Sequence, residues 1–250
     1  TDAADFAINS ETGAITFASA PNFESPTGGA GNNSNAYSLN VVASDGTNTD
    51  TEAIVVNVTN ENDNTPAFTS DSSFSIAEGT DSVATLTGSD ADLTTPTFST
   101  TLAGDDAGDF TLTSGGVLAF AATPDFEAAA DADTNNVYSI TATITDGTNT
   151  ATQAITITVT DANDNNPVLS VATPYSVVEG ATTVATVTAS DADAGTTITF
   201  SLSGTDAADF AINSETGAIT FASAPNFESP TGGAGNNSNA YSLNVVASDG

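Results

Sequence analysis

The chain repeats itself at long range. Residues 1–46 reappear letter for letter as residues 205–250, which sets a period of 204 residues. Inside that period a diverged copy recurs at about half the spacing, so that GTDAADF at 204–210 corresponds to GDDAGDF at 104–110. The unit is therefore about 100 residues long, a length typical of one domain. Solenoid repeats span only about 20–50 residues, so the sequence predicts separate domains in tandem, with two types alternating.

The apolar residues follow the pattern of β-strands. Ile155, Ile157 and Val159 alternate with threonines, and Tyr138 to Ile144 alternates in the same way. A period of two indicates strands with one buried face. Gly- and Asn-containing turns such as Asp146 to Asn149 separate these runs, which favours an all-β, seven-stranded Greek-key sandwich of immunoglobulin-like architecture. In the middle unit we expect strands at 73–77, 82–88, 97–102, 109–113, 116–120, 137–145 and 151–160.

The charged side chains are all acidic. The 250 residues include 32 Asp and Glu and no Lys, Arg or His, which gives a formal net charge of −32. Like charges destabilise a compact fold, and no side chain of the protein can neutralise a carboxylate. Clustered carboxylates would need an external cation, and hard oxygen ligands select calcium. Composition alone leaves a second explanation open, namely that acidity keeps a surface protein soluble in a salty medium.

Missing residue types exclude several classes of function. Without Cys or His there is no disulfide and no conventional zinc or iron site. Without Lys or Arg there is no basic patch, so nucleic acid is a poor partner, and no apolar run is long enough to span a membrane. Acid–base catalysis would depend on carboxylates alone, so we expect no enzyme. A carbohydrate-binding module is weakly supported, because the loop at 25–35 offers mainly Asn and Gly, and Tyr37 is expected to pack in a strand.

Acidic motifs recur at the ends of the predicted strands in a fixed order. In the middle unit the order is EG at 78–79, DAD at 90–92, DFE at 125–127, YSI at 138–140 leading to TDG at 145–147, and DANDNNP at 161–167, and DAD recurs at 191–193 in the next unit. This order resembles the cadherin repeat, and it is most similar to the bacterial cadherin-like domains of very large surface proteins. The resemblance covers the whole chain. It implies the end of one repeat at 1–64, a complete repeat at 65–165, and a repeat at 166–250 that lacks its last strand.

The resemblance also implies calcium ions between consecutive repeats, about three at each junction. By matching motif positions, it assigns ligands to the first junction at Glu24, Asn62, Asp63, Asn64, Asp90, Asp92 and Asp146. It assigns ligands to the second junction at Glu78, Asp125, Glu127, Asp161, Asn163, Asp164, Asn165, Asp191, Asp193 and Asp249. Glu179 and Glu228 would serve a further junction.

Two positions depart from the motif. Asn22 replaces the first acid of the DFE motif, and Asn60 replaces the first Asp of DANDN. The first junction therefore has two fewer formal charges, and we expect it to bind calcium more weakly or to hold fewer ions.

The expected role is an extracellular one at the cell surface. Calcium would stiffen the joints between neighbouring repeats, which would make the chain a stiff extender of a large adhesin whose tip domain binds the target. The alternative is a subunit of a surface filament or sheath, in which many such chains contact one another. Identical modules present identical faces, which favours spacing over recognition, but the sequence alone does not separate these two roles.

Overall fold

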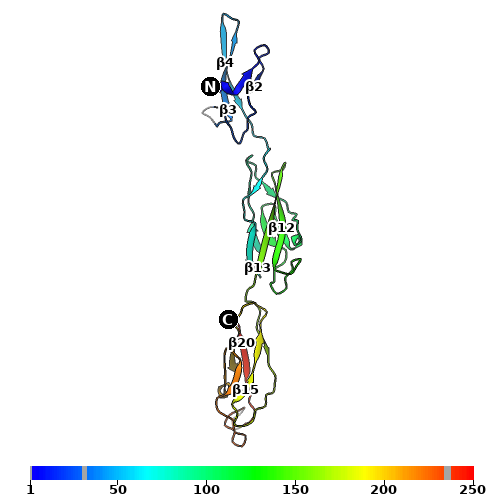
Figure 1. Cartoon of the computed structure of the whole chain (residues 1–250), viewed down its shortest axis with the longest axis vertical. Helices are drawn as coiled ribbons and strands as arrows, with labels where there is room; N and C mark the ends of the chain where they lie inside the picture. The colour runs from blue at the N-terminus through cyan, green and yellow to red at the C-terminus, as the bar shows by residue number, and fades with distance from the viewer. Residues whose placement is uncertain (1, 30–32, 234–237) are drawn as a thin grey trace. The chain divides into compact units, whose positions relative to one another are not determined.

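The computed structural model describes residues 2–29, 33–233 and 238–250, drawn in Figure 1. Residues 30–32 of the loop expected at 25–35 lie outside these ranges. The chain divides into two compact units. The first comprises Thr1–Phe74, Asp81–Ala122 and Tyr138–Ile157, and the second comprises Ser75–Thr80, Thr123–Val137 and Thr158–Gly250.

Two hairpins form the start of the first unit. Strand β3 (Ala36–Ser44) pairs with β4 (Thr49–Asn57) in an antiparallel register of nine residue pairs, from Ala36 opposite Asn57 to Ser44 opposite Thr49. Strand β1 (Phe6–Ile8) pairs with β2 (Ile15–Phe17). Tyr37 is 3 % exposed, as expected for a residue packed in its strand.

Segment 65–165 forms two sheets, in the orders β10-β11-β7 and β6-β13-β12-β9, with a short pair β5-β8 beside them. Figure 1 shows β12 and β13, the two longest of these strands. The three and four strands of the two sheets confirm the predicted seven-stranded sandwich. The strands are β5 (Ala67–Phe68), β6 (Ser73–Ala77), β7 (Ser82–Thr85), β8 (Gly88–Ser89), β9 (Thr97–Phe98), β10 (Phe110–Leu112), β11 (Val117–Phe120), β12 (Val137–Thr145) and β13 (Thr150–Thr160).

The alternating residues of the two long strands form the core. Tyr138, Ile140, Ala142 and Ile144 of β12 are at most 2 % exposed. On β13 the predicted inward positions, Ile155, Ile157 and Val159, are at most 1 % exposed. Full burial of such side chains contributes about 1.5–3 kcal/mol each, so these two strands account for much of the stability of the sandwich.

Segment 166–250 has a less complete set of strands. Its sheets are β14-β16, β15-β19-β18 and β17-β20. Val187, Phe200 and Ile219 are its buried core residues. The strands are β14 (Val168–Ser170), β15 (Thr183–Thr186), β16 (Thr188–Ser190), β17 (Thr199–Ser203), β18 (Phe210–Ile212), β19 (Ala218–Phe221) and β20 (Asn244–Ser248).

An aromatic triad recurs in each repeat. In segment 65–165 the ring centroids of Phe110 and Phe120 are 4.5 Å apart, and Tyr138 packs edge-on against both. The same three positions are occupied by Phe6, Phe17 and Tyr37, and by Phe210, Phe221 and Tyr241, with nearly identical spacings. Edge-to-face packing of this kind is worth about 0.5–1.5 kcal/mol per pair beyond the area buried.

Short 3-10 helices at Ala3–Asp5, Ala107–Asp109 and Ala207–Asp209 precede the first strand of the three aromatic hairpins. Among the residues described, no helix is long and apolar enough to cross a membrane.

Candidate metal centres

Carboxylates of the first unit converge at the ends of its strands. Oxygens of Glu24, Asp63 and Asp92 lie within 4.8 Å of one another, and so do oxygens of Asp90, Asp92 and Asp146. We call these five residues the N-terminal carboxylate cluster. Glu24 and Asp63 come from segment 1–64, and the other three follow β8 and β12 of segment 65–165, so the cluster draws on both predicted repeats.

Hydrogen bonds fix the central carboxylate of this cluster. Asp92 is 2 % exposed, and it accepts hydrogen bonds from the backbone N–H and the side-chain amide of Asn64, both at 2.7 Å. The backbone N–H of Asp92 in turn donates to Asp90 at 2.7 Å. Asn62 donates to the hydroxyl of Thr148 at 3.2 Å, beside Asp146. These bonds hold the carboxylates close together despite their like charge.

The second unit contains a larger set. Three groups, each with oxygens within 4.8 Å of one another, overlap at Glu127 and Asp193. We call their members the C-terminal carboxylate cluster. They are Glu78, Asp125 and Glu127; Glu127, Asp161 and Asp193; and Asp191, Asp193 and Asp249.

Hydrogen bonds equivalent to those of the N-terminal cluster support this cluster. Asp193 is 4 % exposed and accepts hydrogen bonds from the backbone N–H and the amide of Asn165, at 3.0 and 2.8 Å. Glu78 is 6 % exposed and accepts hydrogen bonds from the backbone N–H groups of Phe126 and Ala162. The turn after β13 and the loop around Phe126 are therefore tied to one buried carboxylate.

The predicted asparagine ligands and Asp164 also lie in the clusters. The amide of Asn165 contacts Asp164 at 2.9 Å and Glu127 at 3.2 Å, and Asn64 contacts Asp63 at 2.9 Å. The amide of Asn163 lies 3.5 Å from the backbone carbonyl of Asp249. All predicted ligands are thus brought to one of the two clusters. In contrast, Glu179 and Glu228 belong to none of the carboxylate groups found among the described residues.

Several carboxylate oxygens of the clusters are buried without a hydrogen-bond partner. They are one oxygen each of Glu24, Asp90, Asp161 and Asp191. A buried acceptor without a partner costs free energy, more so when it is charged. Two of these oxygens belong to each junction, in a protein with no cationic side chain. A hard divalent cation is the partner that this donor set fits, because all ligands are oxygens and most are anionic.

The two clusters differ in electrostatics. Burial raises the pKa of Glu127 above its usual value, and the charges of Glu78 and Asp161 raise it further. Burial likewise raises the pKa of Asp164, with the charge of Glu78 as the next cause. In the N-terminal cluster burial also acts to raise the pKa of Asp92, but the hydrogen bonds from Asn64 outweigh it and the pKa is lowered. The pKa of Asp92 is therefore lowered by hydrogen bonds, whereas desolvation and like charges dominate at Glu127 and Asp164.

The two motif departures change the contacts as well as the charge. Asn22 accepts a hydrogen bond from the Ser25 backbone N–H at 2.6 Å, as Asp125 does from Ala128 at 2.9 Å, so the turn is kept and one charge is lost. The Asn60 amide donates to the backbone carbonyl of Asp92. At the matching position Asp161 instead accepts from the Ala194 backbone N–H at 2.6 Å.

Three buried aspartates were not anticipated from the sequence. Asp106 and Asp206 are 5 % and 4 % exposed, and they accept hydrogen bonds from the backbone N–H groups of Ser139 and Ser242. Asp131, which is 3 % exposed, accepts hydrogen bonds from the backbone N–H groups of Asn135 and Asn136. Asp106 thereby ties its loop to β12, whereas Asp131 bonds within its own loop. The recurrence of Asp in the TDAADF and DDAGDF motifs was the signal available for Asp106 and Asp206.

Comparisons with solved structures identify the fold. Mouse cadherin-23 EC22–24 matches 98 % of this chain and 77 % of its own, with a TM-score of 0.61 and 22 % identity. Human CDH23 EC21–23 matches 97 % of this chain and 80 % of its own, with a TM-score of 0.65 and 26 % identity. Protocadherin gammaB7 EC3–6 matches 91 % of this chain and 60 % of its own, with a TM-score of 0.68 and 19 % identity.

No family model matches the sequence, and no curated protein matches it. The structural matches show that the chain is all-β and has the fold of tandem cadherin-like β-sandwich repeats.

Proposed function

We propose that this chain is a calcium-binding extracellular repeat region that acts as a stiff extender of a cell-surface adhesin. The observation that supports calcium most directly is the set of buried, unpartnered carboxylate oxygens of Glu24, Asp90, Asp161 and Asp191. The cadherin-like fold supports an extracellular, adhesion-type role. The resemblance to bacterial surface proteins stays a prediction.

Each cluster would be completed by ions held between two successive repeats. We propose repeat boundaries after residues 64 and 165, so that each cluster takes ligands from both sides of a boundary. Asp92 and Asp193 each belong to two carboxylate groups, which suits a ligand that bridges neighbouring cations. The full proposed ligand set is the one assigned by motif position, with Glu179 and Glu228 reserved for a further junction.

Electrostatics supply the stiffening mechanism. Two like charges about 4 Å apart repel by about 4 kcal/mol at an effective dielectric near 20. Without a cation, the carboxylates from the two sides of a boundary would push the repeats apart and leave a flexible joint. Cations coordinated by ligands from both repeats would replace this repulsion by attraction and would restrict the movement of the joint. The role is therefore mechanical, and no residue of the clusters is proposed to catalyse a reaction.

Calcium titration and small-angle scattering test the proposal together. The 250-residue protein should bind several calcium ions in isothermal titration calorimetry, and magnesium should replace them poorly because it demands a tighter octahedral geometry. Scattering should report a single stiff particle with calcium and a broad distribution of dimensions with chelator. Tight calcium binding with an unchanged scattering profile would refute the stiffening role, whereas absence of binding would refute the sites themselves.

A further inference from the structure

The DFE motif alternates in charge along the chain. Its first position is Asn22, then Asp125, then Asn226. Each of these side chains accepts a hydrogen bond from the backbone N–H three residues later, at 2.6, 2.9 and 2.8 Å. The turn is therefore the same in all three repeats, and only the charge differs. We call the junction at the N-terminal carboxylate cluster the NFE junction and the one at the C-terminal carboxylate cluster the DFE junction. Asn226 indicates that the NFE type recurs after the DFE type.

One group of carboxylates is common to both junctions. In each case three carboxylates of the repeat that follows the junction have oxygens within 4.8 Å of one another. They are Asp90, Asp92 and Asp146 in the NFE junction, and Asp191, Asp193 and Asp249 in the DFE junction. At the matching positions, the two junctions therefore differ only in what the preceding repeat contributes.

The other two groups of the DFE junction each contain an acid that the NFE junction lacks. These groups are Glu78, Asp125 and Glu127, and Glu127, Asp161 and Asp193. In the NFE junction the neutral side chains of Asn22 and Asn60 stand at the positions of Asp125 and Asp161. A cation held at either place in the NFE junction has one charged ligand fewer, and calcium affinity falls with the number of charged ligands.

Asn60 also makes a contact that needs no cation. Its side-chain amide donates a hydrogen bond to the backbone carbonyl of Asp92 in the following repeat. In the DFE junction one oxygen of Asp161 accepts from the Ala194 backbone N–H at 2.6 Å, and its other oxygen is buried without a partner. That oxygen requires a cation, or water that enters as the junction opens. The bond between Asn60 and Asp92 has neither requirement.

Both junctions depend on a cation, but to different extents. Other buried oxygens without a partner belong to Glu24 and Asp90 in the NFE junction and to Asp191 in the DFE junction. Without calcium, the two additional charges of the DFE junction increase the repulsion that favours an open joint. With calcium, the same two charges strengthen ion binding. The stiffness of the DFE junction therefore changes more between these conditions than that of the NFE junction.

We propose that calcium controls stiffness mainly at the DFE junctions, so that every second joint of the chain is a calcium-dependent hinge. This inference rests on the proposed function, because it assumes that calcium binds at the junctions. At low calcium the two repeats beside an NFE junction stay aligned through the bond between Asn60 and Asp92, whereas the DFE junctions bend. The stiff unit is then a pair of repeats, which matches the 204-residue period of the sequence.

Distances between spin labels measure each junction separately. The chain has no Cys, and Ser10, Ser114 and Ser214 are exposed serines at matching positions of the three repeats. Labels at Ser10→Cys and Ser114→Cys span the NFE junction, and labels at Ser114→Cys and Ser214→Cys span the DFE junction. In double electron–electron resonance we expect calcium to narrow the distance distribution across the DFE junction more than the distribution across the NFE junction.

Exchanging the two residues tests the assignment within a single junction. Asp125→Asn with Asp161→Asn gives the DFE junction the side chains of the NFE junction, and it keeps acceptors for the Ala128 and Ala194 backbone N–H groups. In isothermal titration calorimetry this variant should bind calcium at that junction at least about tenfold more weakly. In chelator, its distance distribution across the junction should be narrower than that of the unmodified chain.

The matched control is Asp71→Asn with Asp105→Asn, which removes the same charge from exposed positions of the middle repeat outside the clusters. It should change neither the affinity nor the distribution. The reciprocal variant, Asn22→Asp with Asn60→Asp, should broaden the distribution across the NFE junction in chelator and make it respond to calcium. This second exchange keeps the inference testable if the first one disturbs the fold.

The outcomes distinguish this inference from the proposed function. Absence of calcium binding by the unmodified chain would overturn the proposed function, and the inference with it. Calcium binding with equal narrowing across both junctions, and with no effect of either exchange, would overturn the alternation of hinges alone.

Discussion

Asn64 donates both its backbone N–H and its side-chain amide to the carboxylate of Asp92, each at 2.7 Å. Asn165 makes the same pair of bonds to Asp193, at 3.0 and 2.8 Å. In both cases the turn at the end of one repeat donates two hydrogen bonds to the central carboxylate of the next repeat. That carboxylate comes directly after the second strand of its repeat. This pairing orients Asp92 and Asp193 before any ion binds, and each of the two belongs to two carboxylate groups.

Replacing the central carboxylate should weaken calcium binding strongly. We expect Asp193→Asn to lower calcium affinity at the C-terminal cluster by more than about tenfold, since even residues that only support metal ligands cost about 10–100-fold when changed. Isothermal titration calorimetry measures the change. Glu215→Gln is the matched control, because it removes an exposed charge of the same unit outside the cluster. A similar loss in both variants would mean that net charge, and not the site, governs binding.

Restoring charge at the N-terminal cluster should have the opposite effect. Asn22→Asp keeps the acceptor for the Ser25 backbone N–H, and it adds one carboxylate. Calcium affinity of this cluster should rise, because affinity increases with the number of charged ligands. In the metal-free protein the same change should lower the melting temperature, since it adds repulsion. If affinity does not rise, position 22 does not contribute a ligand.

The sequence predicted the long strands well and the broken ones poorly. The expected ranges 73–77 and 137–145 are those observed, because strict alternation continues to the end of each strand. The expected strand at 82–88 is instead two short strands, β7 and β8. After Thr85 the chain changes partners: Leu86 bonds to Gly116, whereas Thr87 accepts from Thr69. Alternation persists through this switch, so no local pattern marks it.

Two further strands differed from expectation for similar reasons. The strand expected at 97–102 ends at Phe98, because the Ser99 hydroxyl bonds to Thr101 and forms a turn. The two-residue strand β5 was not expected, since two residues give no periodicity.

The candidate sites, like the strands, were predictable from the sequence only in part. Recurrence of motifs was enough to predict which carboxylates come together, because equivalent positions in each repeat fall at equivalent strand ends. It did not reveal which oxygens lack partners, since that depends on backbone N–H groups such as those of Ala162 and Ala194.

The pH dependence of the metal-free protein should differ between the clusters. Glu127 and Asp164 have raised pKa values, so ionising them disfavours the fold. Their contribution to stability is fully present below their ordinary pKa values, about 3.9–4.3, and is lost as pH rises through the raised values. Acidification from neutral pH should therefore stabilise the C-terminal cluster in chelator.

The N-terminal cluster should respond in the opposite direction. Asp92 and Asp146 have lowered pKa values, owing to hydrogen bonds that outweigh burial, so their stabilisation persists until the pH falls below their ordinary value of about 3.9. Carboxyl carbon shifts followed by NMR during a titration measure all four groups. If the pKa values of Glu127 and Asp164 are not raised, the proposed crowding of charge is absent.

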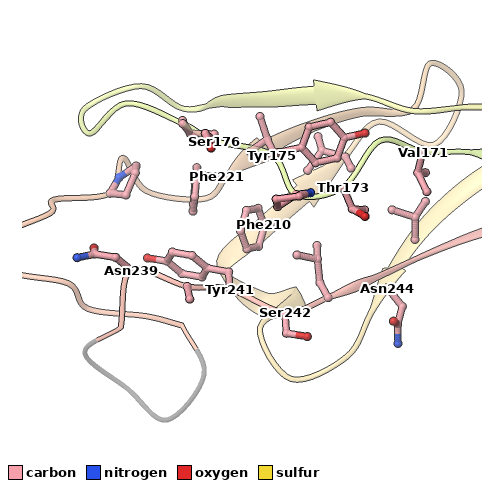
Figure 2. Close-up of a pocket in the computed structure, with 18 of the residues that line it drawn as sticks. Val171, Thr173, Tyr175, Ser176, Phe210, Phe221, Asn239, Tyr241, Ser242 and Asn244 are labelled. Atoms are coloured by element: carbon pink, nitrogen blue, oxygen red, sulfur yellow. The ribbon is translucent and has the colours of Figure 1, made fainter.

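Matched core substitutions should distinguish the packed repeat at 65–165 from segment 166–250, where the equivalent ring lines a pocket. Phe110 and Phe210 occupy the same position of the aromatic triad, and both lie 4.5 Å from their phenylalanine partner. Phe110 is 6 % exposed, whereas Phe210 is half-buried and lines a pocket together with Tyr175 and Tyr241 (Figure 2). Phe110→Ala should cost about 3–5 kcal/mol, the usual range for a buried ring. Phe210→Ala should cost less, because the ring already lacks packing on one side.

Chemical denaturation of the metal-free protein, monitored at dilute concentration, measures both costs. Equal costs would indicate that Phe210 is packed in solution as tightly as Phe110. In that case the two repeats would have equally packed cores.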